Sequence, residues 1–269
     1  MLRRAWFFLA LLLAGCQPPL QRLQQLSAAH AHRVEIYPTA PFPLALSLPQ
    51  QAPAASHLRV YLEGEGHAWA TASQPSLDPS PHQLLLAELA LSDPQPSVYL
   101  ARPCQFVSAP ACRPALWTDR RFAAEVLASL DQALEQLKRR YGNPSFELIG
   151  YSGGGALALL LAARRDDVEL VQTLAGNLTP TQWTQLLHLR LLQDAREPLS
   201  ERARLAQIPQ RHLAGAADPI VPPQLLELYR RQLGPANCLE IAVLPGVSHA
   251  EGWAQAWPQW RDRPLRCQP

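Results

Sequence analysis

The sequence has no large excess of charge of either sign. Its 269 residues carry 24 basic and 22 acidic side chains, which give a formal net charge of +2. Proteins that bind nucleic acid concentrate positive charge on one surface. The balance therefore argues against nucleic acid as a partner, and equally against a strongly acidic one. Lys138 is the only lysine, which we attribute to genome composition.

The sequence also lacks an apolar run long enough to cross a membrane. Residues 5–13 are apolar and follow Arg3 and Arg4, whereas a spanning helix needs ~20 such residues. A positive start, a short apolar run and then small residues are typical of a secretory signal peptide. We therefore predict a signal peptide over residues 1–15.

The end of this segment, Leu13-Ala14-Gly15-Cys16, resembles the lipobox of bacterial lipoproteins. The resemblance implies that Cys16 becomes the lipidated first residue of the mature protein. Several acyl chains would anchor the protein firmly, because one chain alone binds a membrane only marginally. Gln17, where some lipoproteins have aspartate, is similar to lipoproteins sorted to an outer membrane. We expect a lipid-anchored protein of the bacterial cell envelope that faces the periplasm; the alternative is an ordinary signal peptide with a stray cysteine.

The cysteines lack the close spacing and neighbouring histidines of a zinc site. Five cysteines are an odd number for an exported chain, and assigning Cys16 to lipid leaves an even set. Export makes disulfides plausible. Of the three possible pairings we prefer Cys104–Cys112 and Cys238–Cys267. No metal and no cofactor is expected.

Alternating and apolar segments indicate one α/β domain over residues 32–269. Residues 16–31 contain two prolines and many glutamines, which favours a tether between the lipid and the fold. Strands that alternate with helices predict a mostly parallel sheet with helices on both faces, and residues 177–208 a small cap. The predicted strands are 33–37, 44–48, 57–62, 97–101, 146–149, 168–174, 211–215 and 239–244. The predicted helices are about 82–91, about 119–141, 156–163 and one that begins near 222.

The stretch 145–157 organises the chain. A short apolar strand leads into Gly150-Tyr151-Ser152-Gly153-Gly154, which fits G-x-S-x-G, and residues that favour helix follow. Strand, sharp turn and helix form the context of a nucleophile elbow. The turn exposes the serine hydroxyl, and it needs neighbours without side chains. We therefore predict that Ser152 is a nucleophile and that the amide of Gly153 faces a developing oxyanion.

Two further strand ends carry the residues that a serine nucleophile needs. Asp218 follows the strand at 211–215, and His249 follows the strand at 239–244. A serine attacks well only when a base takes its proton, and an imidazole is mostly neutral at pH 7. An aspartate fixes the imidazole tautomer and stabilises the imidazolium. The ends of parallel strands meet at one edge of the sheet, so we predict that these three side chains lie together.

The order Ser152, Asp218, His249 resembles that of the α/β-hydrolase superfamily, over about residues 33–255. The acid loop (Asp218-Pro219-Ile220-Val221-Pro222) and Ser248-His249 near the end are also similar to this superfamily, and the whole resembles exported bacterial lipoprotein hydrolases. The resemblance implies an oxyanion hole completed by the loop after the third strand. There Glu63 stands where such hydrolases usually have histidine, and we expect the amide of Glu65, with Gly66 second, to pair with that of Gly153.

We thus predict a membrane-anchored serine hydrolase that acts on an ester-type bond of a small-molecule or lipid substrate. A peptidase or thioesterase on the same triad is the alternative among enzymes. An inactive hydrolase-fold binding module is the alternative from another class, and Glu63 and Glu65 beside the oxyanion site keep it open.

Other chemistry-bearing residues have less specific explanations. His67 in the presumed oxyanion loop could contact substrate, although a surface histidine is the simpler interpretation. Asn177 follows a strand that supplies the acid in some hydrolases, but it carries no charge. Packing or solvent exposure is expected of His188 and His212, and a solvated turn of Asp166 and Asp167. Asp194 could replace Asp218 only by an unusual geometry. Three roles remain open for Trp183, Trp253 and Trp257: they could line a substrate cleft, lie exposed at a membrane surface or pack in the core.

Overall fold

The computed structural model describes residues 17–51 and 56–267. The predicted signal peptide and Cys16 lie outside the described residues. Eight strands form a single sheet, and its spatial order is β1-β2-β4-β3-β5-β6-β7-β8. β2 is antiparallel to both of its neighbours, and all pairs from β4 to β8 are parallel. The strands are β1 (His32–Tyr37), β2 (Leu44–Pro49), β3 (His57–Leu62), β4 (Ser97–Leu100), β5 (Ser145–Tyr151), β6 (Val168–Leu174), β7 (Gln210–Gly215) and β8 (Leu239–Leu244).

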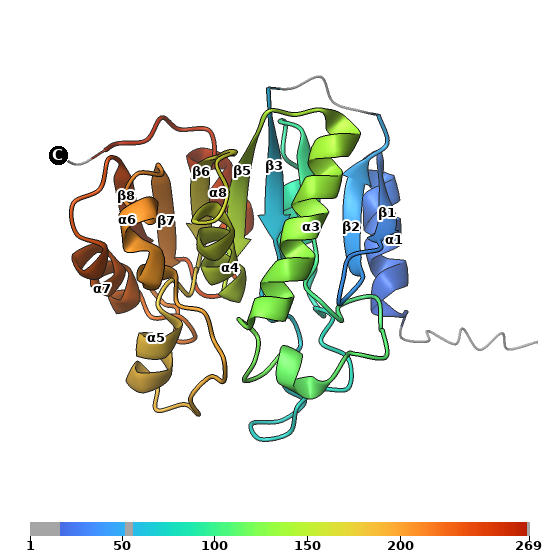
Figure 1. Ribbon diagram of the computed structural model, residues 1–269, viewed down its shortest axis with the longest axis horizontal. Coiled ribbons are helices and arrows are strands. Elements are labelled where there is room, and N and C mark those ends of the chain that lie inside the picture. Colours follow the sequence, from blue (N-terminus) through green and yellow to red (C-terminus); the bar gives the residue numbers. More distant parts are fainter. Residues whose placement is uncertain (1–16, 52–55, 268–269) are drawn as a thin grey trace, which may run out of the picture.

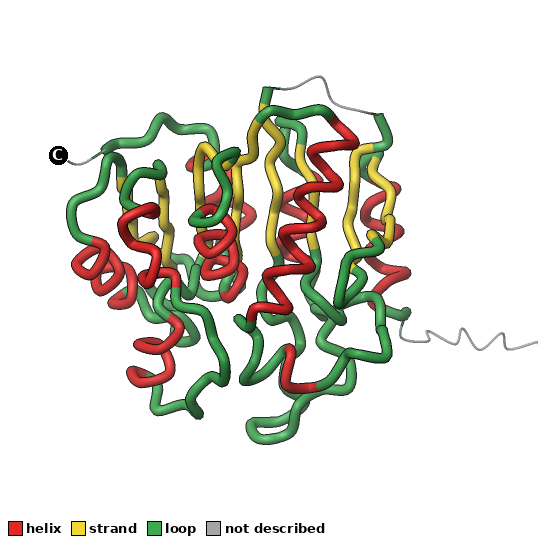
Figure 2. Tube along the Cα trace, viewed as in Figure 1, coloured by secondary structure: helices red, strands yellow, loops and turns green. Residues whose placement is uncertain are grey.

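Helices cover both faces of the sheet, as the alternation of strands and helices predicts (Figures 1 and 2). One apolar core takes residues from α3, α4, α6 and α7, and a second takes residues from α1, α2 and α8. The helices are α1 (Pro19–Ala29), α2 (Leu85–Leu91), α3 (Ala124–Tyr141), α4 (Gly153–Ala162), α5 (Pro180–Leu186), α6 (Arg202–Leu205), α7 (Gln224–Leu233) and α8 (Trp253–Trp260), with 3₁₀ turns η1 (Pro114–Leu116) and η2 (Pro198–Glu201).

The central elements are the most apolar. All residues of α4 are buried, and this helix packs on β5, β6 and β3 beside α3. α3 buries one stripe that includes Val126, Leu130, Leu134 and Leu137, the spacing of one helix face. It ends at Gly142, whose φ of 64° suits a residue without a side chain. The prediction that this helix begins at residue 119 is wrong, because residues 117–123 form turns.

The prediction of a tether over residues 16–31 is wrong for the described part. Residues 19–29 form α1, which packs on β1 and β2. Leu23 is fully buried in the core, and the Ser27 hydroxyl lies 2.8 Å from the Ser47 hydroxyl of β2. The chain is therefore fixed to the sheet almost from the first described residue.

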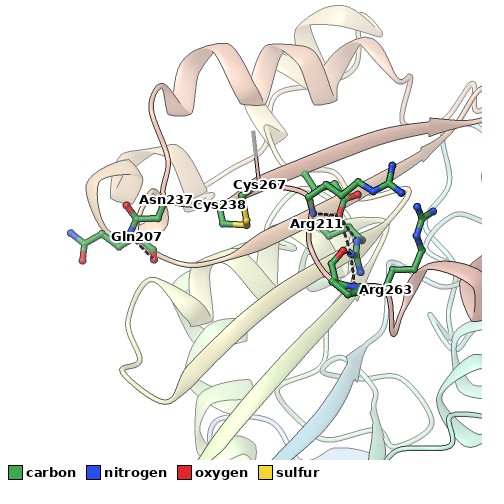
Figure 3. Close-up of a disulfide and its surroundings, with 9 residues drawn as sticks. Gln207, Arg211, Asn237, Cys238, Arg263 and Cys267 are labelled. Atoms are coloured by element: carbon green, nitrogen blue, oxygen red, sulfur yellow. Dashed lines mark hydrogen bonds and ion pairs between the residues drawn. A yellow bond between two sulfur atoms is a disulfide. The ribbon is translucent and has the colours of Figure 1, made fainter. Parts of the chain in front are cut away.

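Both predicted disulfides are present, Cys104–Cys112 and Cys238–Cys267. The second joins the start of β8 to the C-terminal tail, close to Arg211 of β7 (Figure 3). The guanidinium of Arg211 is fully buried and donates to the Glu240 carboxylate and to three carbonyl groups of the tail. A disulfide and the hydrogen bonds of Arg211 thus hold the last segment against the sheet.

The segment 177–208, predicted as a cap, divides into two parts. α5 extends beyond the edge at which the parallel strands end (Figure 1), and Trp183 packs on Val221 and Leu225. By contrast, α6 contacts α7, and Leu205 belongs to the main core. No helix among the described residues is long and apolar enough to cross a membrane.

Candidate active site

Ser152 lies at a sharp turn between β5 and α4. Its φ of 52° and ψ of −125° belong to a strained region for a residue with a side chain. The turn is possible because its glycines allow very close approach: a Cβ on Gly154 would lie 2.2 Å from the Leu62 carbonyl oxygen. The Ser152 side chain thereby points out of the sheet edge, as the G-x-S-x-G pattern predicts.

The structure brings Asp218 and His249 to this serine. His249 Nε2 lies 3.1 Å from Ser152 Oγ, and His249 Nδ1 lies 2.9 Å from Asp218 Oδ2. The other carboxylate oxygen of Asp218 accepts hydrogen bonds from the amides of Ile220 and Val221, at 2.8 and 2.9 Å. The three side chains come from the turns after β5, β7 and β8, so the carboxyl edge of the sheet assembles them.

The loop that carries His249 is held from two sides. The Tyr151 hydroxyl donates to the His249 carbonyl at 2.9 Å, and the indole N–H of Trp253 donates to the same oxygen at 2.9 Å. Trp253 and Trp257 are fully buried, so core packing is the correct one of the alternatives open for these two tryptophans. The hydrogen bonds from Tyr151 and Trp253 restrain the backbone of His249.

The side chain of Glu65 occupies the place where an oxyanion would bind. Its Oε2 accepts a hydrogen bond from the Gly153 amide at 3.0 Å and one from the Ser152 hydroxyl at 3.1 Å. Of the two amides predicted to form the oxyanion hole, that of Gly153 thus donates to a carboxylate oxygen. The sequence did not indicate the carboxylate.

Gly66 forms the turn after this residue. Its φ is 61°, and a Cβ there would lie 2.2 Å from the Pro79 carbonyl oxygen, so only glycine fits. The Gln105 side chain donates to the Gly64 carbonyl at 3.0 Å. These contacts fix the backbone of the loop that follows β3 and carries Glu65.

Two buried arginines neutralise Glu65. Arg121 Nη1 lies 3.3 Å from Glu65 Oε1, and Arg102 Nη1 lies 3.9 Å from the same oxygen. Burial alone would raise the pKa of Glu65, but the charges of Arg121 and Arg102 and the Gly153 amide together lower it to about 2. The carboxylate is therefore ionised at neutral pH. Arg102 Nη1 is itself buried and has no hydrogen-bond partner among the described residues.

Glu63 lies beside this group and behaves in the opposite way. Burial raises the pKa of Glu63 to about 7, although hydrogen bonds from the Tyr99 hydroxyl at 2.7 Å and the Gly64 amide at 2.8 Å lower it in part. The pKa values of these two neighbouring carboxyl groups therefore differ: Glu65 is ionised at pH 7, whereas Glu63 is close to half-protonated. Separation of this kind is common at functional sites.

A cavity of about 1060 Å³ opens above Ser152. Trp183 and Asn177 form part of its wall, together with Arg121. The Arg121 guanidinium lies over the Trp183 ring at 5.5 Å. Asn177 is 1% exposed, and neither polar atom of its side chain has a hydrogen-bond partner among the described residues. A buried amide without a partner is costly, so Asn177 is suited to bind a polar group of a ligand.

The remaining histidines and aspartates behave largely as their simpler interpretations predict. His212 is fully buried in β7, and burial lowers its pKa to about 3. His188 is exposed. His67 lines the cavity and stacks on His82, with 3.9 Å between ring centroids. The three aspartates pair with basic residues away from the cavity: Asp166 with Arg204, Asp167 with Arg165 and Lys138, and Asp194 with Arg120.

Arg102 and Arg121 are the residues that sequence reasoning missed. Arg121 falls within the helix predicted to begin at residue 119, where an arginine is expected to face solvent. The structure instead places it in a turn before α3. Arg102 follows β4 directly, and a basic residue at the carboxyl end of a parallel strand is a signal that could have found it. No group of three or more metal-ligating side chains occurs in the part of the chain that the structure describes.

Comparison with solved structures identifies the fold. The chain is similar to an esterase from Pyrococcus furiosus, with a TM-score of 0.63 and 12% identity over 91% of each chain. It is similar to Est1E from Butyrivibrio proteoclasticus, with a TM-score of 0.59 and 13% identity over 84% of this chain and 94% of that one. An alpha-beta serine hydrolase homologue from Coxiella burnetii gives a TM-score of 0.57 and 14% identity over 85% and 93%.

These likenesses confirm the fold predicted from the sequence. The chain has the fold of the α/β-hydrolase superfamily. No protein-family model matches it, and no curated protein matches it by sequence.

Proposed function

We propose that the protein is a serine hydrolase that cleaves an ester-type bond through an acyl-enzyme on Ser152. The observation that supports this proposal is the continuous contact from Ser152 Oγ through His249 to Asp218, at 3.1 and 2.9 Å. One structural neighbour is an esterase, which favours a carboxylic ester among the possible substrates. The cavity above Ser152 admits a small-molecule or a lipid ester.

Each member of the triad has a separate task. As Ser152 Oγ attacks the carbonyl carbon, His249 Nε2 accepts its proton, and Asp218 stabilises the resulting imidazolium through Nδ1. His249 then gives the proton to the departing alcohol, which leaves an acyl group on Ser152. A water molecule, deprotonated by His249, releases the acid and restores the serine. The amides of Gly153 and Glu65 would stabilise the oxyanion, with each donor worth about 3–4 kcal/mol.

The test is labelling by a neutral fluorophosphonate probe, followed by turnover of p-nitrophenyl esters. Ser152 should take the label, and Ser152→Ala should lose both the label and ~10⁶-fold in kcat. Asp218→Asn should stay folded and lose ~10⁴-fold. Ser200→Ala is the matched control, because Ser200 is an exposed serine in η2. Wild-type label on a serine other than Ser152 would contradict the proposal.

A hydrolase-fold binding module is the second candidate, and one observation favours it. The Glu65 carboxylate fills the position that an oxyanion needs. A binding module predicts a folded protein on which neither the wild type nor Glu65→Gln forms an adduct. Thioester and anilide substrates, matched to the ester in their acyl group, separate an esterase from a thioesterase or a peptidase on the same triad.

We also propose that Cys16 carries a lipid that anchors the protein in the bacterial envelope, facing the periplasm. The motivation is the sequence Leu13-Ala14-Gly15-Cys16 behind a short apolar run. A fatty-acid analogue fed to cells should label the wild type and not Cys16→Ser. Equal label in both proteins would show that the cysteine is not the site.

A further inference from the structure

The Glu65 carboxylate competes with two partners of the proposed reaction. Its Oε2 accepts from the Gly153 amide, which would otherwise hold the substrate's oxyanion. It also lies 3.1 Å from Ser152 Oγ, and His249 Nε2 lies at the same distance. A hydroxyl has one hydrogen to donate, so Ser152 cannot donate to Glu65 and to His249 together. A substrate carbonyl can enter only after the carboxylate has left.

The departure of Glu65 leaves positive charge behind. Arg121 and Arg102 have 9% and 4% of their side-chain surface exposed, and Glu65 is the acidic group paired with both. Arg102 Nη1 already lacks a hydrogen-bond partner among the described residues. Buried charge without a counter-ion is costly. An anion supplied by the substrate would restore the balance that the departing carboxylate removes.

The cavity can receive such an anion. Arg121 lines the cavity, and its guanidinium contacts Glu65 and lies over the Trp183 ring. Asn177 also lines the cavity, and neither polar atom of its buried side chain has a hydrogen-bond partner in the described part of the chain. Guanidinium and amide groups are suited to bind the oxygens of a carboxylate. The Glu65 carboxylate shows that one carboxylate is accommodated between Arg121 and the Gly153 amide.

We propose that Arg121 is a specificity-determining residue that binds an anionic group, of the carboxylate class, on the acyl part of the substrate. The inference rests on the proposed ester hydrolysis. The anion of the substrate replaces Glu65 at Arg121, the Glu65 side chain rotates into the cavity, and the amides of Gly153 and Glu65 become available to the scissile carbonyl. Esters without the anion must displace Glu65 with no compensation, so they react more slowly.

The experiment compares esters of equal chain length that differ in charge. Mono-4-nitrophenyl succinate and glutarate are the anionic probes, and 4-nitrophenyl butyrate and valerate are the neutral ones. In wild type, kcat/KM should favour the anionic esters. Arg121→Gln should reduce this preference by about 10- to 100-fold, the range for a hydrogen bond to a charged group. Arg121→Lys, which keeps the charge, should retain part of it.

Glu65→Gln supplies a second, independent readout. A neutral amide is held less strongly by Arg121, so this variant should hydrolyse the neutral esters faster than wild type does. It should also react faster with the neutral fluorophosphonate, which requires no anion. Circular dichroism and thermal melting of each variant establish that it is folded before its rates are compared.

Two results would overturn the inference and leave the proposed function intact. One is equal kcat/KM for charged and neutral esters in wild type. The other is an Arg121→Gln variant that loses the same factor on both, since Arg121 would then act on the oxyanion and not on a substrate anion. If Ser152 takes no label and no ester is hydrolysed by wild type or by Glu65→Gln, the proposed function and this inference are both wrong.

Discussion

Replacement of Arg211 by methionine should destabilise the protein strongly. The Arg211 guanidinium has no exposed side-chain surface and forms an ion pair with Glu240 at 2.8 Å. It also donates to Gln172 and to the carbonyl groups of Trp260 and Arg263, at 2.9, 2.7 and 2.7 Å. Removal of one partner from a buried ion pair costs about 3–5 kcal/mol, because the other charge stays buried alone.

The double variant Arg211→Met/Glu240→Leu separates charge from packing. It removes the orphaned carboxylate, and apolar replacement of a whole buried pair is often nearly neutral. It should therefore recover part of the loss, but not all of it, since the carbonyl groups of Trp260 and Arg263 still lack their donor. At about 2–4 °C per kcal/mol for a domain of this size, the single variant should melt about 6–20 °C below wild type.

Thermal and urea unfolding followed by circular dichroism, with both disulfides intact, measure these differences. A single variant that loses less than about 1 kcal/mol would refute the reasoning, because the guanidinium would then contribute little beyond its burial. A double variant less stable than the single one would do the same, since it would mean that Glu240 is not left unpaired by the first substitution.

Two further predictions concern stability. The folded state raises the pKa of Glu63 to about 7, so between pH 4.5 and 7 the Glu63 carboxyl binds more protons in the folded than in the unfolded protein. The stability of wild type relative to Glu63→Gln should therefore fall by about 3 kcal/mol as pH rises from 4.5 to 7. A pH-independent difference between the urea midpoints of the two proteins would contradict this. Cys238→Ser/Cys267→Ser, which opens a loop with a sequence separation of 29, should cost about 3–4 kcal/mol in the entropy model, and unchanged unfolding by urea would exclude that role.

The proximity of Ser152, His249 and Asp218 could be predicted from the sequence because each residue belongs to a local signal. Ser152 lies between glycines at a strand-to-helix turn, and Asp218 and His249 follow strands that alternation identifies. Parallel strands carry their ends to one edge, so chain order alone is enough to bring the residues together. The sheet and the helices on both faces follow from the same alternation.

The occupied oxyanion position could not be predicted in this way. It depends on where the Glu65 side chain points, and that is decided by Arg102 and Arg121, which come from distant turns. The apolar stripe predicted a helix from about residue 119, which would include Arg121, but residues 117–123 are not helical. Tertiary contacts between irregular segments, which carry no periodic pattern, determine this part of the site.

The helix α1 was missed because its composition resembles a linker. Glutamines and two prolines dominate residues 17–29, yet Leu20, Leu23 and Leu26 recur at a spacing of three, which is a helical signal. Only Leu23 and Ser27 of this helix are fully buried. A helix with a short apolar stripe among polar residues is stabilised mainly by packing on the sheet. Helix propensity alone does not predict that tertiary contact.

The direction of α1 also determines the end at which the chain enters the fold. β1 is antiparallel to β2, and β2 is antiparallel to β4, so β1 runs in the same direction as β3 to β8. α1 precedes β1 and returns along it, so Pro19 lies at the edge where the parallel strands end and the cavity opens (Figure 1). Three Cα–Cα steps, about 11 Å at most, separate position 16 from Pro19. If position 16 carries the proposed lipid, the anchor therefore joins the fold at the edge of the sheet on which the cavity opens.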